Sequence, residues 1–261
     1  MYEKMDIIME KVRKGEIATG SHIQIGNIVA TDIISRAGFD MLWIDTEHGP
    51  IDKYATLTNI IAAGSGGAAV WVRIPWNDPV LAKPILEMGP DGIIIPLIRS
   101  AEDAKNAVAA CSYPPDGVRG FGPMRAVEYG AIDTMEYINT ISKKMWKIVQ
   151  IEHIDAVNCL DDILDVPGLD AIIVGSYDLS GSMGILGQMM NPELLKTEDM
   201  IAEAARRHNK PFGTSMGMFP EKIKMWKNRG ANFIFVGSDA SYLADGAKNT
   251  YHALCSYIAA K

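Results

Sequence analysis

The stretch MLWIDTEHGPIDKYATLTNIIAAGSGGAAVWVRI, residues 41 to 74, decides the fold. It begins with one short apolar run (41–45) and ends with another (69–74), and a segment of helical length separates them. Four apolar residues of that segment are spaced to share one helix face: Tyr54, Leu57, Ile60 and Ile61. Gly64 follows as a helix stop signal. Apolar runs are typical of parallel strands that helices cover, so the stretch predicts a strand–helix–strand unit of an α/β protein.

The same unit repeats along the whole chain. Eight β-like runs lie at residues 22–25, 41–45, 69–74, 92–98, 147–152, 170–175, 211–216 and 233–237. Eight strands alternating with helices favour a closed (β/α)8 TIM barrel over an open, doubly wound sheet. No G-x-G-x-x-G fingerprint follows the first run, which counts against a dinucleotide-binding sheet. Because no linker-like change in composition appears, we expect residues 1–261 to form a single domain.

Composition narrows the class of partner. The formal net charge of −7 argues against binding to nucleic acid, which needs a clustered excess of Lys and Arg. The first 16 residues mix charges into every turn and so lack the apolar core expected of a signal peptide, and no apolar run approaches the ~18 residues of a membrane span. Cys111, Cys159 and Cys255 lack paired spacing, so neither a disulfide framework nor a zinc-thiolate site is indicated. These features predict a cytoplasmic protein that binds neither nucleic acid nor a membrane.

Charged residues follow several of the predicted strands, at the barrel end where catalytic groups gather. They are Asp45, Glu47 and His48 after the second run, Arg73 in the third, Glu152 in the fifth, and Asp178 after the sixth. Strand alternation turns Gln150 and Glu152 to the same side and His153 away from it. The sequence therefore predicts one polar mouth and places His153 on the surface or at a helix start.

The sequence allows more than one role for several of these residues. Glu152 and Asp178 are 178 − 152 = 26 residues apart, one strand–helix–strand step, so they could bind Mg²⁺ or Mn²⁺ together. Alternatively, they are a surface acid and a helix cap. His48 offers an imidazole, the side chain most often used as a general base, but it could also lie in a solvated turn. Arg73 has apolar neighbours and needs an anion, either a structural carboxylate or a bound carboxylate substrate.

Five segments, in one order, resemble the HpcH/HpaI aldolases, which are metal-dependent class II pyruvate aldolases that cleave 4-hydroxy-2-oxo acids. They are WIDTEHGP (43–50), VRIPWNDPVLAKPILEMG (72–89), YPPDGVRGFGPMRA (113–126), VQIEH (149–153) and GSYDLSGSMG (175–184). The resemblance extends from about residue 17 to 239, nearly the whole chain. It implies a TIM barrel that assembles as a homo-oligomer, a hexamer, and that acts on pyruvate and an aldehyde.

The resemblance also implies roles for individual residues. Glu152 and Asp178 would hold Mg²⁺, Mn²⁺ or Co²⁺, while His48 would be the general base and Arg73 would stabilise the enolate. Gln150 and the backbone around Tyr177 and Asp178 would hold pyruvate. Ser176 and Tyr177 lie beside that site as departures from the family's G-P-x-D-L-S pattern. They imply a carbonyl partner that differs from that of better-known members.

The group that supports His48 is left open. The family pattern implies a carboxylate at Glu87, but Glu87 ends a helix away from the strand mouths and would need a neighbouring subunit to reach His48. Asp45 is the local alternative, and Glu47 would help to order water around the metal. Three other functions are considered: an oxaloacetate decarboxylase, a coenzyme A thioester lyase of the citrate-lyase β-chain type, and a non-catalytic barrel.

Overall fold

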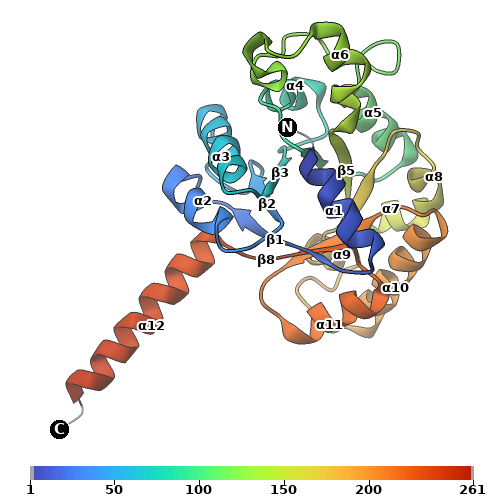
Figure 1. Ribbon diagram of the computed structural model, residues 1–261. Coiled ribbons are helices and arrows are strands. Elements are labelled where there is room, and N and C mark those ends of the chain that lie inside the picture. The colour runs from blue at the N-terminus through green and yellow to red at the C-terminus, as the bar shows by residue number, and fades with distance from the viewer. Residues whose placement is uncertain (1–2, 260–261) are drawn as a thin grey trace.

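The computed structural model describes residues 3–259 and shows a closed barrel of parallel strands (Figure 1). The strands are β1 (Ala18–Ile23), β2 (Met41–Asp45), β3 (Ala69–Arg73), β4 (Gly92–Ile95), β5 (Trp146–Ile151), β6 (Ala171–Val174), β7 (Phe212–Met216) and β8 (Phe233–Ser238). Each strand pairs with the next along the chain, and β1 pairs with β8 to close the ring. The predicted (β/α)8 barrel is confirmed. β1 begins earlier than the run 22–25, because its first residues are small and give no apolar signal.

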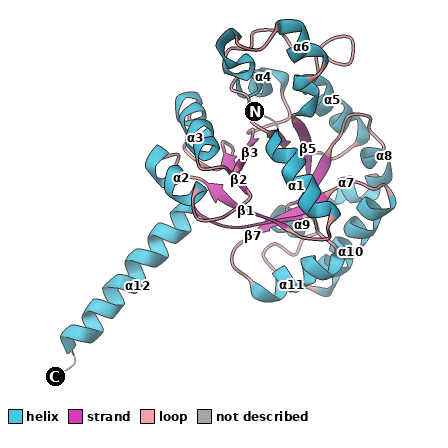
Figure 2. Ribbon diagram, in the orientation of Figure 1, coloured by secondary structure: helices cyan, strands magenta, loops and turns pink. Residues whose placement is uncertain are grey.

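Helices surround the barrel (Figure 2). They are α1 (Glu3–Arg13), α2 (Ile28–Ser35), α3 (Lys53–Ser65), α4 (Pro79–Glu87), α5 (Ala101–Cys111), α6 (Thr134–Asn139), α7 (Ile154–Asn158), α8 (Leu160–Leu164), α9 (Ser176–Ser182), α10 (Pro192–Arg207), α11 (Pro220–Arg229) and α12 (Asp239–Ala259). Two 3₁₀ helices, η1 (Arg125–Gly130) and η2 (Ile141–Lys144), precede β5. The strand–helix–strand unit predicted over residues 41–74 is therefore β2, α3 and β3.

The face that α3 buries matches the predicted one only in part, because Ile60 is buried and Leu57 is half-buried but Tyr54 and Ile61 are exposed. Tyr54 is 76 % exposed, whereas Asn59 is fully buried. The Asn59 amide donates to the carbonyl of Gly26 at 2.9 Å, and its oxygen accepts from the hydroxyl of Thr31 on α2. The buried face of α3 therefore includes a polar residue whose hydrogen bonds are satisfied, which an apolar pattern does not mark.

Large apolar side chains fill the inside of the barrel. Trp43, Trp71, Phe233 and Phe235 are each at most 1 % exposed and pack with ring centroids between 5.1 and 5.4 Å apart. Gly20 makes room for them, since a Cβ there would lie 2.3 Å from Cδ1 of Phe235. Because the lumen is packed, chemistry is confined to the mouth at the carboxyl ends of the strands.

The C-terminal helix α12 extends away from the barrel (Figure 1). Asp239 anchors its first turn by accepting hydrogen bonds from the backbone N–H groups of Gln24 at 2.8 Å and Ile25 at 2.9 Å. Beyond this turn the described side chains of α12 are exposed, among them Tyr251 and Tyr257. No helix between residues 3 and 259 is long and apolar enough to cross a membrane.

Candidate active site

Asp45 and Arg73 form the buried base of the mouth. They end β2 and β3 and are register partners across that parallel pair. Arg73 donates two hydrogen bonds to Asp45, from Nε to Oδ1 at 3.1 Å and from Nη2 to Oδ2 at 2.6 Å. Burial opposes ionisation of Asp45, but Arg73 and two backbone amides outweigh it and lower the pKa of the carboxyl. A structural carboxylate therefore holds one edge of the Arg73 guanidinium, which was one of the two alternatives left open by the sequence.

The turn after β2 folds around the same carboxylate. Asp45 Oδ1 accepts hydrogen bonds from the backbone N–H of Glu47 at 3.1 Å and of His48 at 3.2 Å. Asp45 thus holds the backbone of His48 and not its imidazole, which corrects the role considered for Asp45 as the support of the base. The imidazole is 60 % exposed, and its Nε2 lies 4.0 Å from Glu47 Oε2. The ring is therefore open to a ligand at the mouth.

The other edge of Arg73 faces the centre of the mouth. Nη1 lies 3.1 Å from Glu47 Oε2 and 3.4 Å from Gln150 Oε1, to which it donates a hydrogen bond. Glu47 Oε2 is buried and accepts no well-aligned hydrogen bond from any residue between 3 and 259. An acid oxygen with a free lone pair next to a guanidinium is a position at which a further ligand can bind.

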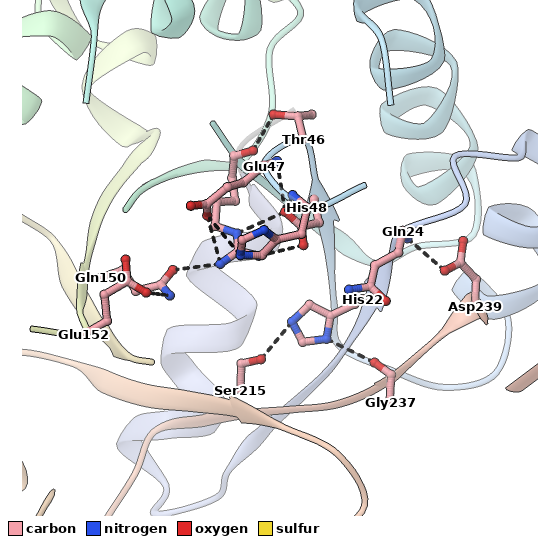
Figure 3. A network of polar contacts seen from close by, with 12 residues as sticks. His22, Gln24, Thr46, Glu47, His48, Gln150, Glu152, Ser215, Gly237 and Asp239 are labelled. Atoms are coloured by element: carbon pink, nitrogen blue, oxygen red, sulfur yellow. Dashed lines mark hydrogen bonds and ion pairs between the residues drawn. The ribbon is translucent and has the colours of Figure 1, made fainter. Parts of the chain in front are cut away.

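Gln150 and Glu152 come from β5 and the residue just beyond it, and Figure 3 shows them directed toward one another. The Gln150 amide donates to Glu152 Oε2, and the backbone N–H of Leu97 donates to Oε1 at 2.7 Å. Burial, with smaller contributions from the charges of Asp178 and Glu47, raises the pKa of Glu152 to about 7. The alternation predicted for this strand is confirmed, and His153 caps α7 by accepting from the N–H of Asp155.

The first turn of α9 carries the remaining predicted residues. Asp178 is exposed at the mouth, and its charge contributes to the raised pKa values of Glu47 and Glu152. Tyr177 is 56 % exposed. Ser176 is only 3 % exposed, and its hydroxyl donates to Glu198 on α10 at 2.7 Å. The hydroxyl of Ser176 is therefore bound to α10, and the predicted place of Ser176 beside the pyruvate site stays a prediction for its backbone alone.

The donor set at the mouth fits a hard divalent cation. Three carboxylates, from Glu47, Glu152 and Asp178, share one local field, and burial is the largest cause of the raised pKa of Glu47 and Glu152. Within residues 3–259 no group of three His, Cys, Asp or Glu side chains is arranged to hold a metal by itself. A cation would therefore take some of its oxygen ligands from water or substrate, as Mg²⁺ commonly does.

Comparison with known proteins decides the family. The family model described as HpcH/HpaI aldolase/citrate lyase matches residues 23–245. The chain belongs to the HpcH/HpaI aldolase/citrate lyase family. It is 35 % identical to a 4-hydroxy-2-oxo-heptane-1,7-dioate aldolase of Salmonella paratyphi C over 92 % of this chain and 90 % of the relative. The family and the enzyme class predicted from the sequence motifs are confirmed.

Solved structures of the HpcH/HpaI family have the same fold. An HpcH/HpaI aldolase from Desulfitobacterium hafniense superposes with a TM-score of 0.86 at 28 % identity, covering 94 % of this chain and 95 % of the other. An aldolase/citrate lyase family protein from Burkholderia cenocepacia gives a TM-score of 0.88 at 27 % identity, covering 95 % and 98 %. The agreement covers nearly the whole chain and so includes every strand that contributes to the mouth.

Glu87 lies outside the mouth of its own HpcH/HpaI barrel. It ends α4, which runs back toward the amino ends of the strands, and its Oε1 accepts a hydrogen bond from Arg119 at 3.3 Å. Oε2 is buried and accepts no hydrogen bond from residues 3–259, and burial raises the pKa of the carboxyl. Within one chain Glu87 therefore lies away from His48, and this separation is what the position of Glu87 at the end of a helix predicted.

Several polar groups of the mouth were not found from the sequence. Leu97 contributes a backbone N–H to Glu152 from a left-handed conformation with φ of 55°, and Thr46 donates to the carbonyl of Arg73. His22 on β1 and Ser215 on β7, the two strands on either side of β8, hydrogen-bond to one another. No local motif marks these residues, and the position of His22 within a β-like run was the sole signal available.

Proposed function

We propose that this chain is a metal-dependent aldolase that cleaves a 4-hydroxy-2-oxo acid to pyruvate and an aldehyde. Membership of the HpcH/HpaI family supports a carbon–carbon lyase. The observation that carries the proposal is the acid excess at the mouth, where Glu47, Glu152 and Asp178 face a single guanidinium, that of Arg73. Such a site suits a cation and an anionic, oxygen-rich substrate together.

Glu152 and Asp178 would hold the cation, which we propose to be Mg²⁺, Mn²⁺ or Co²⁺. Both are carboxylates without thiol or imidazole companions, the ligand type that hard divalent ions prefer. Glu47 Oε2, which pairs with Arg73 Nη1 at 3.1 Å but accepts no well-aligned hydrogen bond from residues 3–259, would orient a water molecule beside them. When bound, the cation supplies positive charge that favours the enolate form of the keto acid.

The side chains around this position would move the proton and hold the developing charge. His48 takes the proton of the C4 hydroxyl, the C3–C4 bond breaks, and its electron pair forms the pyruvate enolate as the aldehyde leaves. The protonated His48 then returns a proton to C3, which becomes the methyl group of pyruvate, and the base is restored. Arg73 Nη1 and the Gln150 amide are fixed beside the enolate, and preorganised donors of this kind can each contribute about 3 kcal/mol to a transition state.

We propose a homo-oligomer, by resemblance a hexamer, in which Glu87 supports His48 of a neighbouring subunit. Glu87 is remote from its own His48 and retains one buried oxygen without a hydrogen bond from residues 3–259. The exposed apolar residues of α12, such as Leu254 and Ile258, are suited to contact another copy. Sedimentation velocity should show an assembly that truncation before Leu243 weakens, and a monodisperse full-length monomer would contradict this part.

The function is tested by pyruvate release from a panel of 4-hydroxy-2-oxo acids, coupled to NADH oxidation by lactate dehydrogenase. We expect at least one acid to release pyruvate with added Mg²⁺ or Mn²⁺, and a chelator to stop the reaction. Glu152→Ala should abolish the activity, while Glu203→Ala, an exposed glutamate on α10, serves as the matched control. Cleavage of oxaloacetate alone would instead assign the decarboxylase alternative.

A further inference from the structure

The mouth has a second half that carries no acid cluster. In the ring of eight strands, β1 and β7 lie opposite β5 and β3, which supply Glu152 and Arg73. From β1 and β7 come His22 and Ser215, which Figure 3 shows directed toward each other. His22 is 8 % exposed and packs on Trp43 with ring centroids 4.8 Å apart, while Ser215 remains partly exposed. Ser215 therefore presents the accessible polar atom of this half.

The hydrogen bonds of His22 fix the direction of the Ser215 hydroxyl. His22 Nδ1 lies 3.0 Å from the carbonyl oxygen of Gly237, which can only accept, so Nδ1 carries a proton. His22 Nε2 lies 3.0 Å from Ser215 Oγ. Burial is the largest cause that lowers the pKa of His22 to about 4, with the charge of Arg73 acting in the same direction. The ring is thus neutral at pH 7, Nε2 is an acceptor, and the Ser215 O–H must donate to it.

One consequence concerns what Ser215 can offer a ligand. Its only proton is committed to His22, so the oxygen is left with lone pairs alone. Such an atom accepts a hydrogen bond from a hydroxyl group and repels the oxygens of a carboxylate. The nearest guanidinium, that of Arg73, is already bound to Asp45, Glu47 and Gln150. No residue of the His22–Ser215 pair could neutralise a second carboxylate.

We propose that Ser215 is a specificity-determining residue that accepts a hydrogen bond from a hydroxyl group of the aldehyde, so that the preferred partner is a hydroxyaldehyde. This inference rests on the proposed aldolase function and names the substrate class of the same site. His22 is a positioning residue, because it acts through the direction it imposes on the Ser215 proton. The acid half of the mouth would hold pyruvate, and the neutral half would select its partner.

The test is a matched pair of aldehydes in the direction of carbon–carbon bond formation with pyruvate. Glycolaldehyde and propanal have the same number of heavy atoms and differ by a hydroxyl in place of a methyl group. The ratio of their kcat/KM values contains their intrinsic reactivities, which cancel when the ratio is compared between variants. We expect Ser215→Ala to lower the glycolaldehyde-to-propanal ratio by about 10-fold, the scale of one lost hydrogen bond.

Two further variants separate specificity from structure. Ser215→Thr keeps the hydroxyl and should retain most of the wild-type ratio. His22→Phe keeps an aromatic ring but frees the Ser215 proton, so it should lower the ratio and raise the relative rate with glyoxylate, whose carboxylate accepts a hydrogen bond. Ser112→Ala is the control, because Ser112 is a half-buried serine at the end of α5 whose hydroxyl donates to the carbonyl of Val108. It should leave the ratio unchanged.

An unchanged ratio in Ser215→Ala would overturn the inference, as would a wild-type preference for glyoxylate over glycolaldehyde that Ser215→Ala does not alter. Exchange of the pyruvate methyl protons in heavy water, measured without any aldehyde, distinguishes failure of the Ser215 assignment from failure of the proposed function. If the wild type exchanges these protons and the ratios do not move, the assignment of Ser215 fails while the proposed function stands. If the wild type shows no exchange, the proposed function fails and this inference fails with it.

Discussion

Two clusters of charged side chains in this barrel differ in how their charges are balanced. The helix cluster, formed by Glu198, Asp199, Lys222 and Arg229 between α10 and α11, contains two acids and two bases. Glu198 is fully buried and accepts from Lys222 at 2.6 Å, from Arg229 at 2.9 Å and from Ser176 at 2.7 Å. Every charge in this cluster meets its opposite.

The mouth cluster has the opposite balance. It contains four carboxylates, those of Asp45, Glu47, Glu152 and Asp178, against the one guanidinium of Arg73. The pKa values of Glu47 and Glu152 are raised, first because these groups are buried and second because their neighbours are also acids. A balanced cluster is complete by itself, whereas an acid excess is tolerated where a cation or a ligand completes it.

The largest effect is expected from a substitution that removes the central acid of the helix cluster. Glu198→Ala leaves Lys222 and Arg229 buried without their main partner, and uncompensated buried charge costs about 3–5 kcal/mol. We therefore expect the free energy of unfolding, measured by urea denaturation, to fall by that amount. Glu203→Ala, an exposed acid on the same helix, is the control. A loss below about 1 kcal/mol would mean that the helix cluster is not structural.

At the mouth, the corresponding change should affect turnover more than folding. Lys at position 73 offers one ammonium group where Asp45 takes two N–H donors and Glu47 faces a third nitrogen. Arg73→Lys should lower kcat for pyruvate release by at least about 100-fold, with a smaller change in Mn²⁺ affinity by calorimetry. Arg36→Lys on the exposed end of α2 is the matched control. Near-normal turnover would assign Arg73 to structure.

Asp91 is a buried acid that belongs to neither cluster, so it can be compared with both. Its Oδ2 accepts from the N–H of Val70 at 2.8 Å, and burial raises its pKa to about 6. The raised pKa means that the Asp91 carboxyl keeps its proton in the folded state at pH values where it is ionised in the unfolded state. The stabilising contribution of this proton is present in full below the unfolded pKa of 3.8 and is lost as the pH rises through about 6. We therefore expect the free energy of unfolding of Asp91→Asn to rise relative to that of wild type by on the order of 2 kcal/mol as the pH increases from 4 to 7.

The measurement is urea unfolding of both proteins in chelator across that range. A stability difference that does not vary with pH would show that the Asp91 charge is compensated in the folded protein.

The residues that could be predicted from sequence are those that a local pattern marks. Strand–helix alternation predicted the barrel, and the charged ends of β2, β3 and β5 predicted the mouth. Contacts between distant segments could not be found this way. No pattern in the sequence links Ser176 on α9 to Glu198 on α10, and His22 meets Ser215 only when the barrel closes. The buried face of α3 was predicted only in part for the same reason, because Asn59 finds its partners on α2 and the preceding loop.

The central claim, that the acid excess of the mouth serves a cation and a pyruvate enolate, is tested most directly by proton exchange. Wild-type protein with Mg²⁺ or Mn²⁺ in heavy water, without any aldehyde, should replace the methyl protons of pyruvate by deuterium, as followed by proton NMR. A chelator should stop the exchange, and His48→Ala should slow it by roughly 100-fold. Metal-loaded protein that leaves the methyl signal intact over hours would contradict the account, as would exchange that a chelator does not affect.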